Sequence, residues 1–211
     1  MRQTAKEAML ARIHAAIVNA PEPPEISHNF RERDERDRTA IVKDFIHQLV
    51  EYKAVVTHTD DASLPQSIVD ACQKHSISRL LVPADVPIAW LPPGVTVRRD
   101  DPPLTLPELE SCSGVLTGCA MGIAQTGTII LDGGAFQGRR VLSLLPDVHL
   151  CVVRAEQIVG LVPEAIAKLA GRVTLPITLI SGPSATSDIE LSRVEGVHGP
   201  RTLHVLVVDG L

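Results

Sequence analysis

The stretch from Ser181 to Glu190 carries the residue types best suited to binding an anion. Its sequence, Ser-Gly-Pro-Ser-Ala-Thr-Ser-Asp-Ile-Glu, follows an apolar run and is rich in small and hydroxyl-bearing residues. A strand is expected to end and a helix to begin here, which leaves backbone N–H groups free to bind an anion. The candidate binding residues within it are Gly182, Pro183, Ser184, Thr186 and Asp188.

A second short stretch, Gly-Val-His-Gly-Pro from Gly196 to Pro200, precedes the last apolar run. Ligands of open α/β sheets collect at the carboxyl ends of the strands, so the sequence predicts that the Ser181 loop lies there and that His198 folds back towards it. His198 is the candidate catalytic residue, and Gly199 is a candidate binding residue. An orienting hydrogen bond that holds the loop is an equally weighted role for His198.

Two adjacent arginines precede a further apolar run, Val141-Leu-Ser-Leu-Leu-Pro. A guanidinium in a loop beside a strand can hold a carboxylate or phosphate through two parallel hydrogen bonds, which makes Arg140 a candidate binding residue. Arg139 is expected to be solvated at the surface. Trp90 stands among three prolines, where we expect it to anchor an irregular loop; a ligand-binding aromatic is the alternative.

Hydrophobic periodicity predicts the elements that position these residues. Helices are expected at 4–18, 39–52, 63–75, 104–110 and 156–169. Strands are expected at 54–57, 79–83, 95–97, 113–121, 126–131, 149–153, 177–180 and 203–208. The first strand, helix and strand predict a βαβ unit, and the run at 177–180 is expected to complete a second one.

Composition favours an α/β fold, because only 2% of the residues are aromatic and the core must consist of aliphatic side chains. The net charge of −5 and the absence of a long basic block argue against nucleic acid as a partner. No apolar run is long enough to span a membrane, so a cytoplasmic protein is expected. The four cysteines lack metal-ligand spacing and are expected to be buried as small apolar residues.

Two parts of the chain are expected: an N-terminal helix with a charged linker over residues 1–38, and an α/β domain over residues 39–211. The linker alternates arginines with acidic residues and is interpreted as solvated or as the start of the next helix. A single helix cannot bury its own apolar face, so it is expected to dock on the main domain, another subunit or a partner.

Four motifs, taken in order, are familiar together. They are Gly122-Ile-Ala with Thr126-Gly-Thr, Arg140-Val-Leu-Ser-Leu-Leu-Pro-Asp-Val-His, the Ser181 stretch and Gly-Val-His-Gly-Pro. This series resembles the lactate-utilisation protein C family, the LUD domain, over about the C-terminal half. Thr126 and Gly127 join the candidate anion-binding residues, although the glycines of this region lack the order of a dinucleotide fingerprint and crowding or turns are their preferred role.

The resemblance implies a three-layer α/β/α core with a mainly parallel sheet, similar to the NagB, ribose-5-phosphate isomerase and CoA-transferase superfamily. It also implies an accessory subunit in the oxidation of L-lactate to pyruvate, acting with separate iron–sulfur subunits and holding no cofactor or metal of its own. One departure is Ala185, where the family usually has a basic residue. If that residue binds an anion in relatives, the contact is lost here or Arg140 supplies it.

Two other functions stay open from the residues alone. The chain could be an independent enzyme acting on a small phosphorylated or CoA-linked substrate, although His198 is the sole acid or base that its loops offer. It could also be a binding domain that recognises a carboxylate or phosphate without turnover. The sequence predicts a small anionic ligand in all three cases and leaves the oligomeric state undetermined.

Overall fold

The computed structural model describes residues 4–18, 24, 29–172, 174–183 and 199–209, and the chain divides into two compact units, Met1–Phe30 and Arg31–Leu211. The first unit contains α1 (Ala5–Ile17), the helix expected from the sequence. It begins with a capping box, in which the backbone N–H of Thr4 donates to Glu7 Oε2 at 2.8 Å and the hydroxyl of Thr4 accepts from the Glu7 N–H. None of the residues of α1 is buried.

The second unit is an α/β domain whose elements largely follow the predicted helices and strands. Its α-helices are α2 (Arg38–Glu51), α3 (Leu64–Lys74), α4 (Leu106–Glu110) and α5 (Val162–Leu169). Its strands are β1 (Val55–Thr59), β2 (Arg79–Val82), β3 (Thr96–Arg99), β4 (Gly114–Thr117), β5 (Met121–Ile123), β6 (Thr128–Leu131), β7 (Val148–Arg154), β8 (Ile158–Val159), β9 (Thr178–Ile180) and β10 (Thr202–Val208). Short 3₁₀ turns are η1 (Ile88–Trp90), η2 (Ala124–Thr126), η3 (Arg140–Ser143), η4 (Ala155–Gln157) and η5 (Ala170–Arg172).

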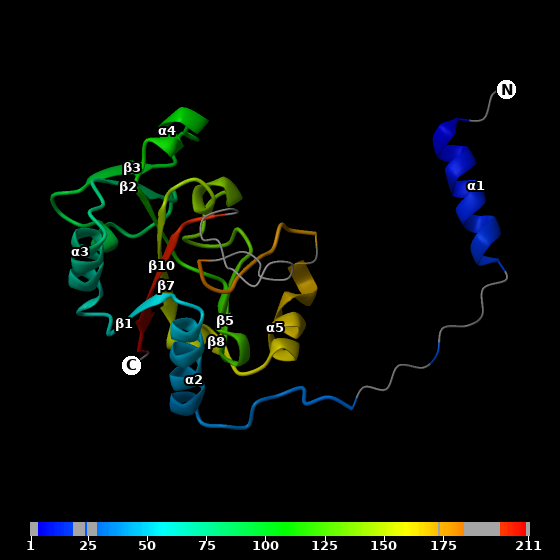
Figure 1. Ribbon diagram of the computed structural model, residues 1–211, viewed down its shortest axis with the longest axis horizontal. Helices are drawn as coiled ribbons and strands as arrows, with labels where there is room; N and C mark the ends of the chain where they lie inside the picture. The colour runs from blue at the N-terminus through cyan, green and yellow to red at the C-terminus, as the bar shows by residue number, and fades with distance from the viewer. Residues whose placement is uncertain (1–3, 19–23, 25–28, 173, 184–198, 210–211) are drawn as a thin grey trace. The chain divides into compact units, whose positions relative to one another are not determined.

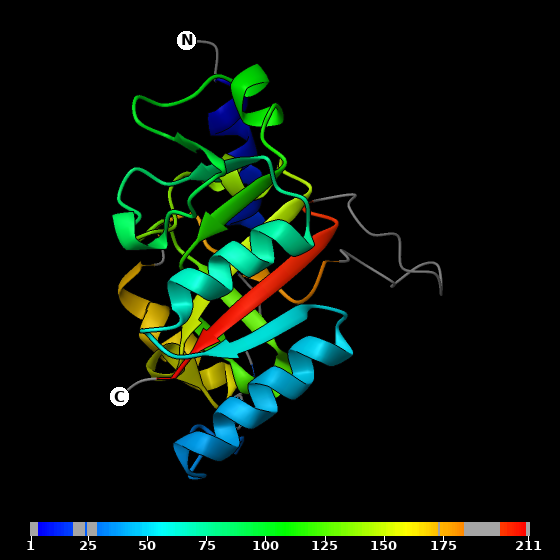
Figure 2. The same cartoon turned by 90° about the vertical axis from the view of Figure 1, so that its left-hand side faces the viewer.

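The main sheet has six parallel strands in the order β1-β10-β7-β4-β2-β3. Strands β7 and β10 are neighbours in the interior of the sheet and pair along their whole lengths, from Thr202 opposite Val148 to Val208 opposite Arg154. Almost every residue of these two strands is buried, because both faces of a parallel sheet are covered. Figure 2 shows α3 crossing one face of this sheet in front of β10.

Two apolar clusters separate the faces of the sheet. On one face Leu64 and Ile68 of α3 pack with Leu150 of β7 and Leu206 of β10. On the other face Phe45 and Leu49 of α2 pack with the intervening residues of the same strands, Cys151, Val153, Val205 and Val207. Figure 1 shows α3 on one side of the sheet, and α5, β5 and β8 on the other. The predicted three-layer α/β/α arrangement with a mainly parallel sheet is confirmed.

A second sheet of four strands, in the order β8-β5-β6-β9, lies in the layer with α2 and α5. Strand β9 pairs antiparallel with β6, from Ile129 opposite Ile180 to Leu131 opposite Thr178. The prediction that residues 177–180 complete a second βαβ unit is therefore wrong. The expected helix at 156–169 is also shorter, because Ile158 and Val159 form a strand beside β5 and α5 starts only at Val162.

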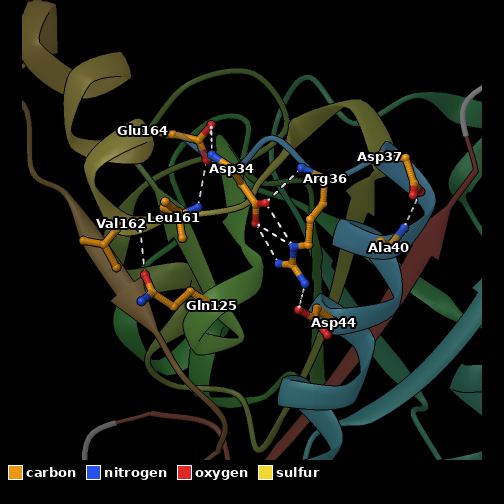
Figure 3. Close-up of polar contacts among 9 residues, drawn as sticks. All are labelled: Asp34, Arg36, Asp37, Ala40, Asp44, Gln125, Leu161, Val162 and Glu164. Carbon is orange, nitrogen blue, oxygen red and sulfur yellow. Dashed lines mark hydrogen bonds and ion pairs between the residues drawn. The ribbon is translucent and has the colours of Figure 1, made fainter. Parts of the chain in front are cut away.

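The charged segment before α2 is mostly exposed, as predicted, and its last residue, Arg38, begins α2, but Asp34 within it contacts the domain. The side chain of Asp34 is 1% exposed and accepts hydrogen bonds from Arg36 Nε at 3.0 Å and from Arg36 Nη2 at 2.7 Å. Arg36 also contacts Asp44 of α2, and the N–H of Asp34 lies 3.4 Å from Glu164 Oε1 (Figure 3). The hydrogen bonds from Arg36 hold the pKa of Asp34 at about 2, so this contact persists at acidic pH.

Two histidines lie within the buried central strands, and each is bonded to a threonine of a neighbouring strand. His204 Nε2 lies 2.8 Å from Thr57 Oγ1 of β1, and His149 Nε2 lies 2.7 Å from Thr117 Oγ1 of β4. The other ring nitrogen of His204 lies 3.0 Å from Nε2 of His75. Burial, followed by the nearby His75 and Lys74, lowers the pKa of His204 to about 4.

We expect His204 to make the domain less stable in acid. The pKa of His204 falls from 6.5 to about 4 on folding, so the unfolded chain binds the extra proton between these values and stability falls with falling pH. As the pH falls from 6.5 to 4, the free energy of unfolding of the wild type should drop by about 3 kcal/mol more than that of His204→Gln. Above pH 6.5 the free energies of the two proteins should change with pH in the same way. Urea titrations at a series of pH values measure both; equal slopes for the two proteins would contradict the prediction.

Candidate functional site

A cavity of about 430 Å³, here called the Arg140 cavity, lies where β9 meets the amino ends of β7 and β10. Its wall includes Arg140 and Ser143 of η3, His149 of β7, Thr178 of β9 and Leu203 of β10. The loop after β9 adds Ser181, Gly182 and Pro183, and the segment before β10 adds Gly199 and Pro200. Four of the sequence-predicted binding residues, Arg140, Gly182, Pro183 and Gly199, thus line one cavity.

The position of this cavity corrects one expectation. The Ser181 loop follows the carboxyl end of β9, but β9 belongs to the four-stranded sheet. In the main sheet the cavity touches His149 and Leu203, which stand one position into β7 and β10 from their amino ends. The prediction that the loop lies at the carboxyl ends of the parallel strands is therefore wrong, because the chain leaves the main sheet before it makes β9.

Arg140 supplies the positive charge of the cavity. Its side chain is exposed, and within the described part of the chain its guanidinium makes no ion pair or hydrogen bond. Arg139 is exposed as predicted, but unlike Arg140 it donates from Nε to Asp100 Oδ2 at 2.8 Å and from Nη2 to Asp100 Oδ1 at 2.7 Å. The bond from Arg139 lowers the pKa of the buried Asp100 carboxyl and fixes the loop before η3.

Hydroxyl groups supply most of the other hydrogen-bonding capacity of the wall. Ser143 and Thr178 are nearly buried, at 5% and 9% exposure, and Ser143 Oγ donates to the carbonyl of Arg140 at 3.2 Å. Ser181 Oγ lies 2.7 Å from Thr128 Oγ1. Neutral hydroxyls around a guanidinium that has no ion partner among the described residues favour a small carboxylate or phosphate, because they can donate to its oxygens without adding charge.

Thr126 and Gly127 stand behind this wall rather than in it. Thr126 Oγ1 lies 2.7 Å from Thr128 Oγ1, so it reaches the cavity only through Thr128 and Ser181. Gly127 has a φ of +56°, and a Cβ atom there would lie 2.8 Å from the backbone carbonyl carbon of Gln48 in α2. The structure therefore supports a role for Gly127 in close backbone packing and turns. Gly127 is not among the described residues that line the cavity.

Gly182 lines the cavity and also occupies a position that favours glycine. Its φ of +80° lies in the left-handed region. A Cβ atom at this position would collide with the backbone oxygen of Tyr52, the residue that ends α2. The loop after β9 is consequently pressed against the end of α2, which fixes where Ser181 and Pro183 meet the cavity.

Several predicted site residues lie outside the described residues: Ser184, Thr186, Asp188 and the candidate catalytic residue His198, together with Ala185. Four further cavity residues were not among the predicted binding residues: His149, Ser143, Thr178 and Ser181. A signal for His149 was present, since it is a polar residue at the start of an otherwise apolar strand and buried polar groups require partners. Its ring is 1% exposed and is held by Thr117.

The four cysteines are buried, as the sequence predicts. Cys119 and Cys151 share an apolar cluster, and Thr117 Oγ1 lies 3.9 Å from Cys151 Sγ. Among the residues that the structure describes, no cluster of three or more His, Cys, Asp or Glu side chains is arranged to hold a metal ion. No helix in the same set of residues has the length and apolar character needed to cross a membrane.

Comparison with known proteins connects this arrangement to a family. The model of the LUD domain matches residues 42–208. A lactate utilization protein C from Deinococcus radiodurans is 48% identical over 206 residues, which cover 97% of this chain and 95% of that protein. The lactate utilization protein C of Bacillus subtilis is 36% identical over 107 residues, covering 47% of this chain and 44% of the relative.

A solved structure gives the same assignment. A DUF162 family protein from Deinococcus radiodurans superimposes with a TM-score of 0.72 at 45% sequence identity, covering 82% of this chain and 99% of the other. The matched family region begins within α2 and ends at the last residue of β10, so it includes all six strands of the main sheet and the cavity wall. The chain belongs to the LUD domain family.

Proposed function

We propose that this protein acts in lactate utilisation, as an accessory subunit in the oxidation of L-lactate to pyruvate. The observation that carries the proposal is the near full-length match, at 48% identity, to a protein named lactate utilization protein C. Oxidation of lactate to pyruvate releases two electrons and two protons, so it needs an electron acceptor. The proposal assigns that role to separate iron–sulfur subunits, which the family resemblance implies.

The Arg140 cavity supports the proposal that this chain binds a small carboxylate. One guanidinium without a partner in the described residues lines a wall that also carries Ser143, Thr178 and Ser181. Lactate and pyruvate each carry one carboxylate and one further oxygen, which a guanidinium and neighbouring hydroxyl groups can bind together. The buried ring of His149 forms part of the same wall and could contact that further oxygen.

A gene deletion with co-purification tests the proposed assembly. Deletion of the gene in its native host should abolish growth on L-lactate and leave growth on glucose unchanged. Purification of the tagged protein at its native level should recover iron–sulfur proteins in constant proportion. Unchanged growth on L-lactate together with recovery of no redox protein would contradict the proposal.

A phosphorylated or CoA-linked ligand is the alternative, because a guanidinium binds phosphate as well as carboxylate and a cavity of about 430 Å³ admits larger molecules than lactate. A thermal-shift series with L-lactate, pyruvate, inorganic phosphate, sugar phosphates and CoA esters separates the two, since a ligand of the native state must stabilise it. Stabilisation by phosphate esters alone would favour the alternative over the lactate-related proposal.

A further inference from the structure

We propose that a second cavity, beside Trp90, binds a small anion that carries a planar ring, of the nucleoside monophosphate class. This Trp90 cavity has a volume of about 330 Å³ and is lined by Trp90, Cys119, Phe136, Arg154 and Lys168, among other residues. No described residue lines both this cavity and the Arg140 cavity. The inference is independent of the role proposed for that first cavity.

The Trp90 cavity lies at the carboxyl edge of the main sheet. Gly118 directly follows β4, Arg154 is the last residue of β7, and both line the cavity. Open α/β sheets bind ligands in the crevice outside the carboxyl ends of their strands, because loops and side chains converge there without blocking the backbone. The Trp90 cavity therefore lies at the edge of the main sheet where the Ser181 loop was expected.

An aromatic wall equips the cavity for a planar ring. Trp90 is 8% exposed, and its ring centroid lies 5.6 Å from that of Phe136 at an interplanar angle of 57°. The turn η1 fixes the backbone of Trp90, whose backbone N–H donates to the carbonyl of Pro87 at 3.0 Å. Within the described residues the indole Nε1–H has no hydrogen-bond partner, although a buried donor normally has one.

One lysine in the lining could bind an anion. Lys168 projects from the last turn of α5 and makes no ion pair in the described part of the chain. Arg154 is held by Asp61, at 2.8 Å from Nη2 to Oδ1. The carboxylate of Asp132 also lines the cavity, and its Oδ1 accepts from the N–H of Gly134 at 2.9 Å and from Gln137 Nε2 at 3.0 Å. Because Arg154 is already paired with Asp61, Lys168 is the one lining cation without an ion partner among the described residues, and it is the group that would meet an anion.

Size and chemistry together select the ligand class. A volume of about 330 Å³ is at the lower end of small-molecule sites, which suits one base and one phosphate better than a dinucleotide. Stacking of a base on an aromatic side chain is worth about 1 to 3 kcal/mol, and Lys168 adds a charge-assisted bond to a phosphate. A ring without a phosphate would not engage Lys168, and a phosphate without a ring would not stack on Trp90.

Trp90 makes this site directly measurable, because it is the single tryptophan of the chain. Titration of the full-length protein with AMP should change the intrinsic tryptophan fluorescence saturably. Adenosine lacks the phosphate and ribose 5-phosphate lacks the base, so each should bind about tenfold more weakly than AMP. Lys168→Gln should raise the dissociation constant for AMP about three- to tenfold, and its exposed position leaves the core intact.

Two control variants separate this site from non-specific binding and from the Arg140 cavity. Lys74→Gln removes an exposed lysine from the last turn of α3, which is equivalent to the place of Lys168 in α5, and should leave AMP affinity unchanged. Arg140→Gln should also leave it unchanged. Absence of a saturable fluorescence change with AMP would overturn the proposal. So would affinity for ribose 5-phosphate equal to that for AMP, or weakening by Arg140→Gln instead of Lys168→Gln.

Discussion

Replacing Arg140 with glutamine is expected to weaken the binding of small carboxylates about 10- to 100-fold. The guanidinium is the single charged side chain among the described residues that line the Arg140 cavity, so its loss removes the charge-assisted hydrogen bonds that hold the carboxylate. Such bonds contribute about 1.5 to 3 kcal/mol. Isothermal titration calorimetry with pyruvate and with L-lactate measures the dissociation constants.

A matched control is Arg79→Gln, which removes an exposed arginine at the start of β2, outside the lining of the cavity. It should keep the affinity of the wild type, and both variants should unfold at the same urea concentration as the wild type. If Arg140→Gln and Arg79→Gln weakened binding equally, the carboxylate would be attracted by the overall charge and not by this cavity. The same pair of variants can be tested for restoring growth on L-lactate to the deletion strain.

Replacing Gly127 with alanine is expected to lower the free energy of unfolding by about 2 to 5 kcal/mol. With a φ of +56°, the residue is in the left-handed region, where an L-residue with a side chain is strained. The new Cβ atom would also lie 2.8 Å from the Gln48 carbonyl carbon and 3.0 Å from the Leu49 nitrogen. Because both are backbone atoms of α2, relief requires the helix to shift, which adds about 1 to 3 kcal/mol.

Gly133→Ala separates the two causes. Gly133 has a φ of +72°, but no heavy atom lies within 4 Å of the position of its Cβ. This substitution should therefore cost only the backbone strain, about 1 to 2 kcal/mol. Urea unfolding of the two variants measures the difference. Equal destabilisation would mean that α2 does not approach Gly127 as closely as the structure shows.

The substitutions Arg140→Gln and Gly127→Ala test whether two residues with similar predicted roles have different roles in the protein. Arg140 and Gly127 both belong to motifs of the family resemblance and were both candidate binding residues. In the structure Arg140 borders the cavity, whereas Gly127 allows α2 to pack against η2. Loss of stability without loss of carboxylate affinity at Gly127, and the reverse at Arg140, would establish this difference experimentally.

The elements of the fold could be predicted from local patterns, but the connections between sheets could not. The helices over 39–52 and 63–75 follow an apolar stripe of helical period, and α2 and α3 confirm them. Strand β9 was also predicted at nearly its observed position. Its partner was not, because an apolar run of three or four residues suits a parallel and an antiparallel neighbour equally and contains no signal for either.

For the candidate site, the sequence by itself determined the residue types: a guanidinium, a glycine-containing loop and hydroxyl groups that suit an anion. It also placed the chain in a family through motifs whose order needs no coordinates. Tertiary structure alone decided that Arg140, Gly182, Pro183 and Gly199 line one cavity, that His149 joins them, and that Thr126 and Gly127 do not. The physical reason is that a side chain's chemistry is local, whereas its neighbours depend on which strands pair, and β9 pairs with β6 outside the main sheet.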